Sequence, residues 1–70
     1  MTVIFRQGDW KIVEYKTELG QTQDGRVKAF HYKLTKKGVD HKFYATAIKW
    51  PSLDLPDTET VIKVLKTFII

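Results

Sequence analysis

Few side chains in this sequence could serve as nucleophiles, general bases or metal ligands, and they lie far apart. The only serine, Ser52, stands between Pro51 and Leu53, with no histidine close to it in the chain. His31 and His41 are the only histidines, and there is no cysteine. No spacing typical of a zinc site, a phosphate-binding glycine loop or a nucleophile elbow occurs. The residue types therefore predict a protein with no catalytic site, no metal and no cofactor.

Positive charge, in contrast, is concentrated in one segment. Residues 25–50 contain seven Lys and Arg residues against one acidic residue, Asp40, which gives the segment a formal charge of +6. Residues 1–24 and residues 51–70 each sum to −1, so the whole chain carries +4. A polyanion would be steered towards the basic segment whatever its own sequence. Nucleic acid is the polyanion for which such a segment is typical.

Rings alternate with these cations, and we expect His31, Tyr44 and Trp50 on the solvent face of a sheet. Lysines neutralise phosphates and rings stack on unpaired bases, so the pattern predicts nucleic-acid binding through a hairpin over residues 26–50. Single-stranded DNA or RNA is favoured over duplex. The predicted contacts are Lys33, Lys36, Lys37, Lys42, Tyr44 and Trp50. The competing interpretation is a solvated basic surface that only keeps a hairpin soluble.

The segments that would position these side chains have the composition of β-strands. Val, Ile, Phe, Tyr and Trp recur up to residue 50, and turn residues interrupt them at 8–9, 20–25 and 36–38. This pattern is typical of antiparallel hairpins. It predicts four strands near residues 2–7, 10–19, 26–35 and 39–50.

The alternation of residue types also predicts how the last two strands pair. A tip at Lys36-Lys37, followed by Gly38 with a positive φ, places Tyr32 opposite His41 on an apolar face. Phe43 would lie on that same face. The charged residues of the hairpin would then occupy the other face.

The first two turns of the chain predict a second apolar cluster on the opposite face. A turn at Asp24-Gly25 places Tyr15 opposite Leu34 on the first apolar face. A turn at Gly8-Asp9 then brings four residues together on the other face: Val3, Phe5, Trp10 and Ile12. Such a cluster predicts an interface with a protein partner or with a second copy of the chain, unless strong sheet curvature closes it. The alternative function is therefore a protein-interaction module, such as a small regulator or inhibitor.

The end of the chain changes from strand to helix periodicity. Apolar residues recur there at helical spacing: Val61, Ile62, Leu65, Phe68 and Ile69. Pro56 suits a first turn and either Asp54 or Asp57 can cap it, so the segment predicts a helix over 57–69. We expect it to cover the apolar sheet face, with Leu65 and Phe68 against Phe30, Tyr32 and Phe43. The expected fold is α+β, a four-stranded antiparallel meander covered on one face by a C-terminal helix.

Length and composition bound this organisation. A chain of 70 residues and 8.2 kDa buries about 60 % of its unfolded surface, so we expect residues 1–70 to form a single small domain. A hydrophobic fraction of 43 % indicates that this domain is ordered. Neither a secretory leader nor a membrane span is predicted. We expect a cytoplasmic protein, because the chain has no cysteine that an oxidising compartment would pair.

Overall fold

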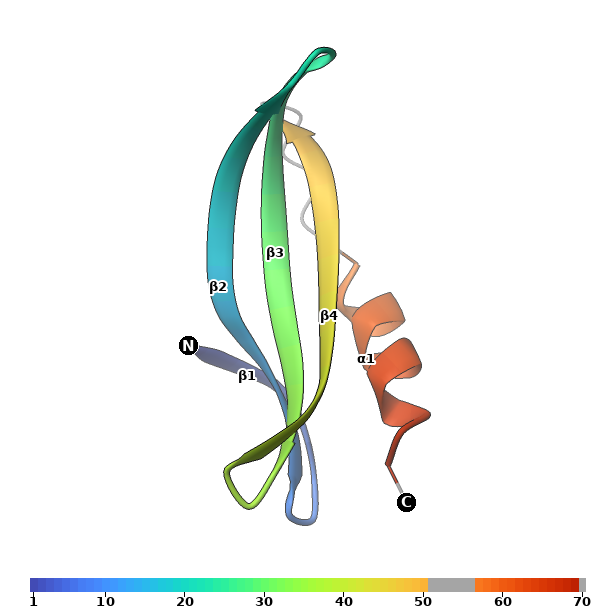
Figure 1. Cartoon of the computed structure of the whole chain (residues 1–70). Coiled ribbons are helices and arrows are strands. Elements are labelled where there is room, and N and C mark those ends of the chain that lie inside the picture. The colour runs from blue at the N-terminus through green and yellow to red at the C-terminus, as the bar shows by residue number, and fades with distance from the viewer. Residues whose placement is uncertain (51–56, 70) are drawn as a thin grey trace.

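The computed structural model describes residues 1–50, apart from the Trp50 side chain, and residues 57–69. Within these residues the chain folds into four strands followed by one helix (Figure 1). These elements are β1 (Thr2–Gln7), β2 (Trp10–Thr22), β3 (Gly25–Lys36), β4 (Val39–Trp50) and α1 (Thr58–Lys66). The strands form one antiparallel sheet in the order β1-β2-β3-β4. The predicted α+β class and the predicted order of the strands are therefore confirmed.

The hydrophobic core lies between one face of the sheet and α1. Six buried side chains form a single cluster there: Ile12, Phe30, Tyr32, Leu34, Val61 and Leu65. Leu65 is buried, as predicted, whereas Phe68 is 43 % exposed. The prediction for Phe68 is wrong because α1 ends at Lys66, so the helical stripe that we extended to residue 69 stops one turn earlier.

A carboxylate fixes the start of α1. Asp57 is the N-cap: its Oδ1 accepts a hydrogen bond from the backbone N–H of Glu59 at 3.1 Å, and its Oδ2 accepts one from the Thr60 hydroxyl at 2.7 Å. These bonds, the Thr60 hydroxyl first, lower the pKa of Asp57. A lowered carboxyl pKa stabilises the folded state above the pKa of the unfolded chain, and this contribution is lost as the pH falls through the folded value. α1 is the one helix within the described residues, and it is too short to cross a membrane.

Each pair of neighbouring strands contains one irregularity, a residue with no partner on the next strand. These extra residues are Ile4 in β1, Tyr15 in β2 and His41 in β4. Such a β-bulge places two consecutive residues on the same face of a sheet and increases its local bending. Ile4 and Phe5 are one such pair, and both pack against the core. Figure 1 shows the sheet strongly bent in the region where β1 crosses behind β2.

The turn between β3 and β4 lies one residue later than predicted. Lys36 pairs with Val39, so Lys37 and Gly38 form a two-residue turn. Gly38 has a φ of +81°, as predicted, and Lys37 also has a positive φ, +52°. Positive φ at both central positions is the geometry of a type I′ hairpin turn.

This turn and the bulge at His41 overturn the register predicted for β3 and β4. Tyr32 pairs with Tyr44, not with His41. The predicted and observed registers differ by an odd number of residues, and an odd shift exchanges the two faces of a strand. Phe43 therefore lies on the face turned away from α1, and its predicted contact with the helix is wrong.

The register predicted for β2 and β3 is wrong for the same reason. The turn lies at residues 23–24, because Thr22 pairs with Gly25, and the bulge adds a further shift. Ile12, not Tyr15, is consequently the partner of Leu34. This places Tyr15 on the face turned away from α1 and Ile12 in the core.

We expect removal of the Leu65 side chain to destabilise the fold strongly. Leu65 is 1 % exposed in the only cluster that joins α1 to the sheet among the described residues. Leu65→Ala should lower the free energy of unfolding by about 2–5 kcal/mol, because it leaves a cavity in a small core. Chemical denaturation measures this change. The control is Val64→Ala at the preceding position, where the side chain is 38 % exposed. An equal loss of unfolding free energy in both variants would contradict the packing of α1 on the sheet described above.

We also expect Lys37 to be a position of backbone strain. Lys37→Asn should raise the free energy of unfolding by about 0.5–1 kcal/mol, because asparagine tolerates positive φ better than lysine does. Thermal denaturation measures the change. Lys37→Ala is the control, since it also removes the lysine but retains a side chain unsuited to positive φ. Equal stabilisation by alanine would show that the loss of the lysine head, and not the relief of strain, is responsible.

Candidate nucleic-acid interface

The face of the sheet turned away from α1, called here the open face, has no helix or strand packed over it among the described residues. Alternation along the strands and the three bulges determine which side chains it carries. These side chains form rows, each of which runs across the strands. The rows are given in order, from the end of the sheet with the Gly8-Asp9 turn to the opposite end. The rows are Arg6, Lys11, Thr35 and Asp40; Val3, Val13, Lys33 and Phe43; Tyr15, Lys16, His31 and Ala45; Glu18, Ala29 and Ala47; and Gly20, Val27 and Lys49.

Three rings gather in the middle of the open face. Tyr15 lies 6.1 Å from Phe43 in an edge-to-face contact with an interplanar angle of 76°, and 6.0 Å from His31, between ring centroids. Phe43 is 59 % exposed and lies on β4, the edge strand of the sheet. Large exposed apolar side chains in a cluster usually mark a contact surface.

A lysine stands beside this ring cluster. Lys33 is the direct cross-strand partner of Phe43. Its Nζ lies 5.4 Å from the centroid of the Tyr15 ring and 3.5 Å from Oδ1 of Asp40. The cation is therefore held against the half-buried Tyr15 ring by a cation–π contact and near Asp40 by an ion pair, and it lies across the strand from the exposed Phe43.

The bulge in β2 adds a second cation next to the rings. It places both Tyr15 and the following residue, Lys16, on the open face. Lys16 forms a hydrogen-bonded ion pair with Glu18, which raises the pKa of Lys16 and lowers the pKa of Glu18. Both groups are therefore charged at neutral pH. Nε2 of His31 lies 3.7 Å from Oε2 of the same carboxylate.

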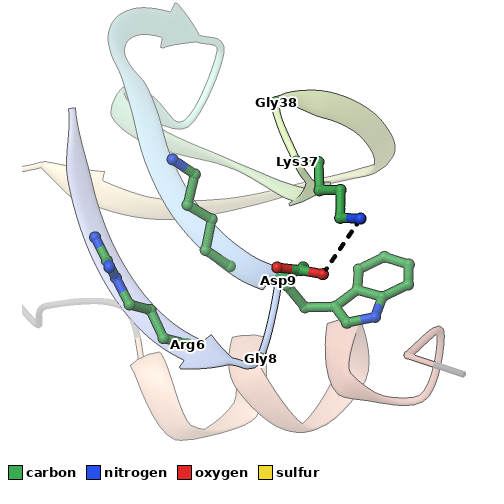
Figure 2. Close-up of a pocket in the computed structure, with 7 residues that line it drawn as sticks. Arg6, Gly8, Asp9, Lys37 and Gly38 are labelled. Atoms are coloured by element: carbon green, nitrogen blue, oxygen red, sulfur yellow. Dashed lines mark ion pairs between the residues drawn. The ribbon is translucent and has the colours of Figure 1, made fainter.

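The two-residue turns of the first and last hairpins meet at one end of the sheet. The backbone N–H of Lys37 donates a hydrogen bond to the carbonyl oxygen of Asp9 at 3.4 Å, and Lys37 Nζ lies 3.7 Å from Asp9 Oδ2 (Figure 2). Arg6 and Lys11 form a cross-strand pair close to this junction. Neither has an ion-pair partner within residues 1–50 and 57–69, so both charges remain uncompensated.

The six contacts predicted from the sequence do not form one surface. Lys33 lies on the open face and Lys37 lies at the turn. Tyr44 packs against the core on the helix side, and its prediction as an exposed stacking ring is wrong because of the register shift. The side chain of Trp50 lies outside the described residues.

Two further lysines of that prediction lie on the helix side. Lys36 Nζ is 5.2 Å from the centroid of the Trp10 ring, and Lys42 Nζ is 4.7 Å from that of Phe68. Both cations therefore border the core and cannot act together with Lys33.

The predicted second apolar cluster does not exist as an exposed surface. Ile12 is fully buried, and Phe5 and Trp10 pack against the core. Val3 alone lies on the open face, because the bulge at Ile4 separates it from Phe5. The four residues therefore belong to both faces of the sheet, and the argument for an interface built from them no longer holds.

The two histidines lie on opposite faces, as predicted, although His41 is exposed. Its ring contacts Trp10 on the helix side, at 5.0 Å between centroids, while His31 is on the open face. In the part of the chain that the structure describes, no three His, Asp or Glu side chains are grouped in a way that could hold a metal ion.

Sequence reasoning missed Tyr15 and Phe43, the two rings that define the open face. A partial signal was present, since a glycine at the second central position favours a type I′ turn at Lys37-Gly38. That turn alone would have corrected the pairing at the tip.

Comparison of the chain with models of known protein families, with curated proteins and with solved structures found no match.

Proposed function

We propose that this protein is a small non-catalytic module that binds single-stranded nucleic acid on its open face. The observation that supports this function best is the position of Phe43, which is 59 % exposed on the edge strand β4, in contact with Tyr15 and opposite Lys33. An exposed ring next to a cation matches the two groups that a nucleotide presents, a flat base and a charged phosphate.

The rings would supply affinity without selecting a sequence. Every base has a flat aromatic surface, and stacking on a side chain requires that the base be unpaired. Phe43 offers such a ring, and the edge contact with Tyr15 keeps it in place. This geometry favours single strands over duplexes.

The charges of the open face would hold the backbone of the strand. The face carries five cations, Arg6, Lys11, Lys16, Lys33 and Lys49, against two anions, Glu18 and Asp40. Each phosphate that these cations neutralise releases counterions and adds to the affinity. Four of the five are lysines, which contact phosphate as point charges and read base edges poorly. Binding should therefore depend little on the sequence of the nucleic acid.

We also place the protein in the cytoplasm as part of this proposal, since a chain without cysteine needs no oxidising compartment.

The first test is the removal of the exposed ring. Phe43→Ala should weaken binding of a labelled single-stranded oligonucleotide about 5- to 150-fold, because stacking on one base contributes about 1–3 kcal/mol. Fluorescence anisotropy at low salt, with DNA and RNA single strands and a DNA duplex, measures the effect. Binding to the duplex should be weaker than to single strands and should change less.

Phe68→Ala is the matched control for this variant. Phe68 is also a partly exposed phenylalanine, at 43 %, but it lies on the helix side and contacts Lys42. It should leave the affinity unchanged. Equal effects of both variants, or no binding by the wild type at low salt, would contradict the proposal and would favour a protein partner for the open face.

The second test is the salt dependence of binding. Removing one cation that contacts a phosphate should reduce the slope of log K against log salt by about 0.7 on a single strand. Lys33→Gln should show this reduction. Lys63→Gln, which removes an exposed lysine of α1, should leave the slope as in the wild type. Equal slopes for Lys33→Gln and the wild type would show that Lys33 does not contact the backbone.

A further inference from the structure

A hollow of about 190 Å³ lies on the open face beside the ring cluster. Its lining consists of Lys11, Val13, Lys33, Thr35 and Asp40 on two adjacent rows, together with Met1 and Gly38. Lys33 belongs both to this hollow and to the ring cluster, because its Nζ also lies against Tyr15. The hollow therefore lies next to the Phe43 ring, the position where a base of the proposed ligand would stack.

The floor of the hollow holds an unusual residue for a buried strand position. Thr35 is 3 % exposed, and its hydroxyl has no hydrogen-bond partner among residues 1–50 and 57–69. A buried hydroxyl without a partner destabilises a fold, and valine would fill the same space without that penalty. The hydrogen-bonding capacity of the Thr35 hydroxyl is therefore unused among the described residues, as is that of the Tyr32 hydroxyl and of His31 Nε2.

The charges around this hydroxyl favour an anion. Lys11 and Asp40 are the direct cross-strand neighbours of Thr35, and Lys33 precedes Thr35 by two residues on the same strand. Asp40 is already paired with Lys33 at 3.5 Å, so the positive charge of Lys11 is left uncompensated. The hollow thus combines an excess cation with a hydroxyl donor that is unpaired but covered, and cations and hydroxyl donors are two kinds of group that bind phosphate oxygens.

We propose that this hollow binds one phosphate group of the strand whose base stacks on Phe43, an inference that rests on the function proposed above. The ammonium groups of Lys11 and Lys33 neutralise the phosphate, and the Thr35 hydroxyl donates a hydrogen bond to one of its oxygens. The hydroxyl is covered in the free protein. A phosphate oxygen reaches it when the long, flexible stems of the two lysines move aside.

The test uses three variants and two ligands. Thr35→Val should weaken binding of a single-stranded oligonucleotide about 10-fold while raising the melting temperature, because it removes a hydrogen bond to a charged group and a buried unpaired hydroxyl together. Thr35→Ser retains the donor and should bind within about 3-fold of the wild type. Thr46→Val is the control, since Thr46 is the partner of Phe30 on the helix side of the sheet.

Inorganic pyrophosphate separates the hollow from the rings. Followed by NMR in the wild type, it should shift the backbone amide signals of Thr35 and Lys33, and these shifts should be absent in Thr35→Val. If the oligonucleotide binds with the expected dependence on Phe43 but Thr35→Val binds as tightly as the wild type, the subsite is wrong and the proposed function stands. If pyrophosphate shifts these amides but no oligonucleotide binds, the anion site stands and the nucleic-acid function is wrong.

Discussion

One extra residue in each pair of neighbouring strands determines which side chains reach which face of this sheet. In a regular strand the side chains alternate between faces, but a bulge places two neighbours on one face. At Ile4 the bulge supplies the core with two apolar residues in succession, the second being Phe5. At Tyr15 it supplies the open face with a ring and, next to it, the cation of Lys16. A regular β2 strand would place only one of these two side chains there, so the bulge is what joins the ring and the charge on one surface.

The charge of a segment does not by itself locate a binding surface in this chain. Of the seven cations within residues 25–50, only two lie on the open face. Others border the core, as the contacts of Lys36 with Trp10 and of Lys42 with Phe68 show. Their aliphatic stems cover the rim of a small core while their heads remain in water, so they contribute to stability through packing and cation–π contacts. Lys33 differs because the ring that it contacts, that of Tyr15, belongs to the open face.

The elements of the fold could be predicted from the sequence, but the faces of the sheet could not. Strands and turns depend on local composition, which is why the bounds of β1 and β4 agree with the prediction. The faces depend on the sum of every turn position and every bulge, and one residue of error reverses them. Phe43 and Tyr44 illustrate this, since they are adjacent and the shift decided which of them packs against the core. The bulge at His41 leaves no mark in the residue types, so the face that carries Tyr15 and Phe43 became visible only when the strands were paired.

The open face has no second layer above it within the described residues, yet two of its side chains are almost fully buried. Val13 is 4 % exposed and Thr35 is 3 % exposed, and both line the hollow that also contains Lys11 and Lys33. In a single-layer sheet such cover comes from neighbouring side chains on the same face, and the long stems of lysine can provide it. A bound phosphate would attract the ammonium groups of these lysines. It would then cover Val13 and Thr35 in place of the lysine stems. Under the proposal above, the same two lysine side chains would serve both states, as cover for the face in the free protein and as partners of the anion in the complex.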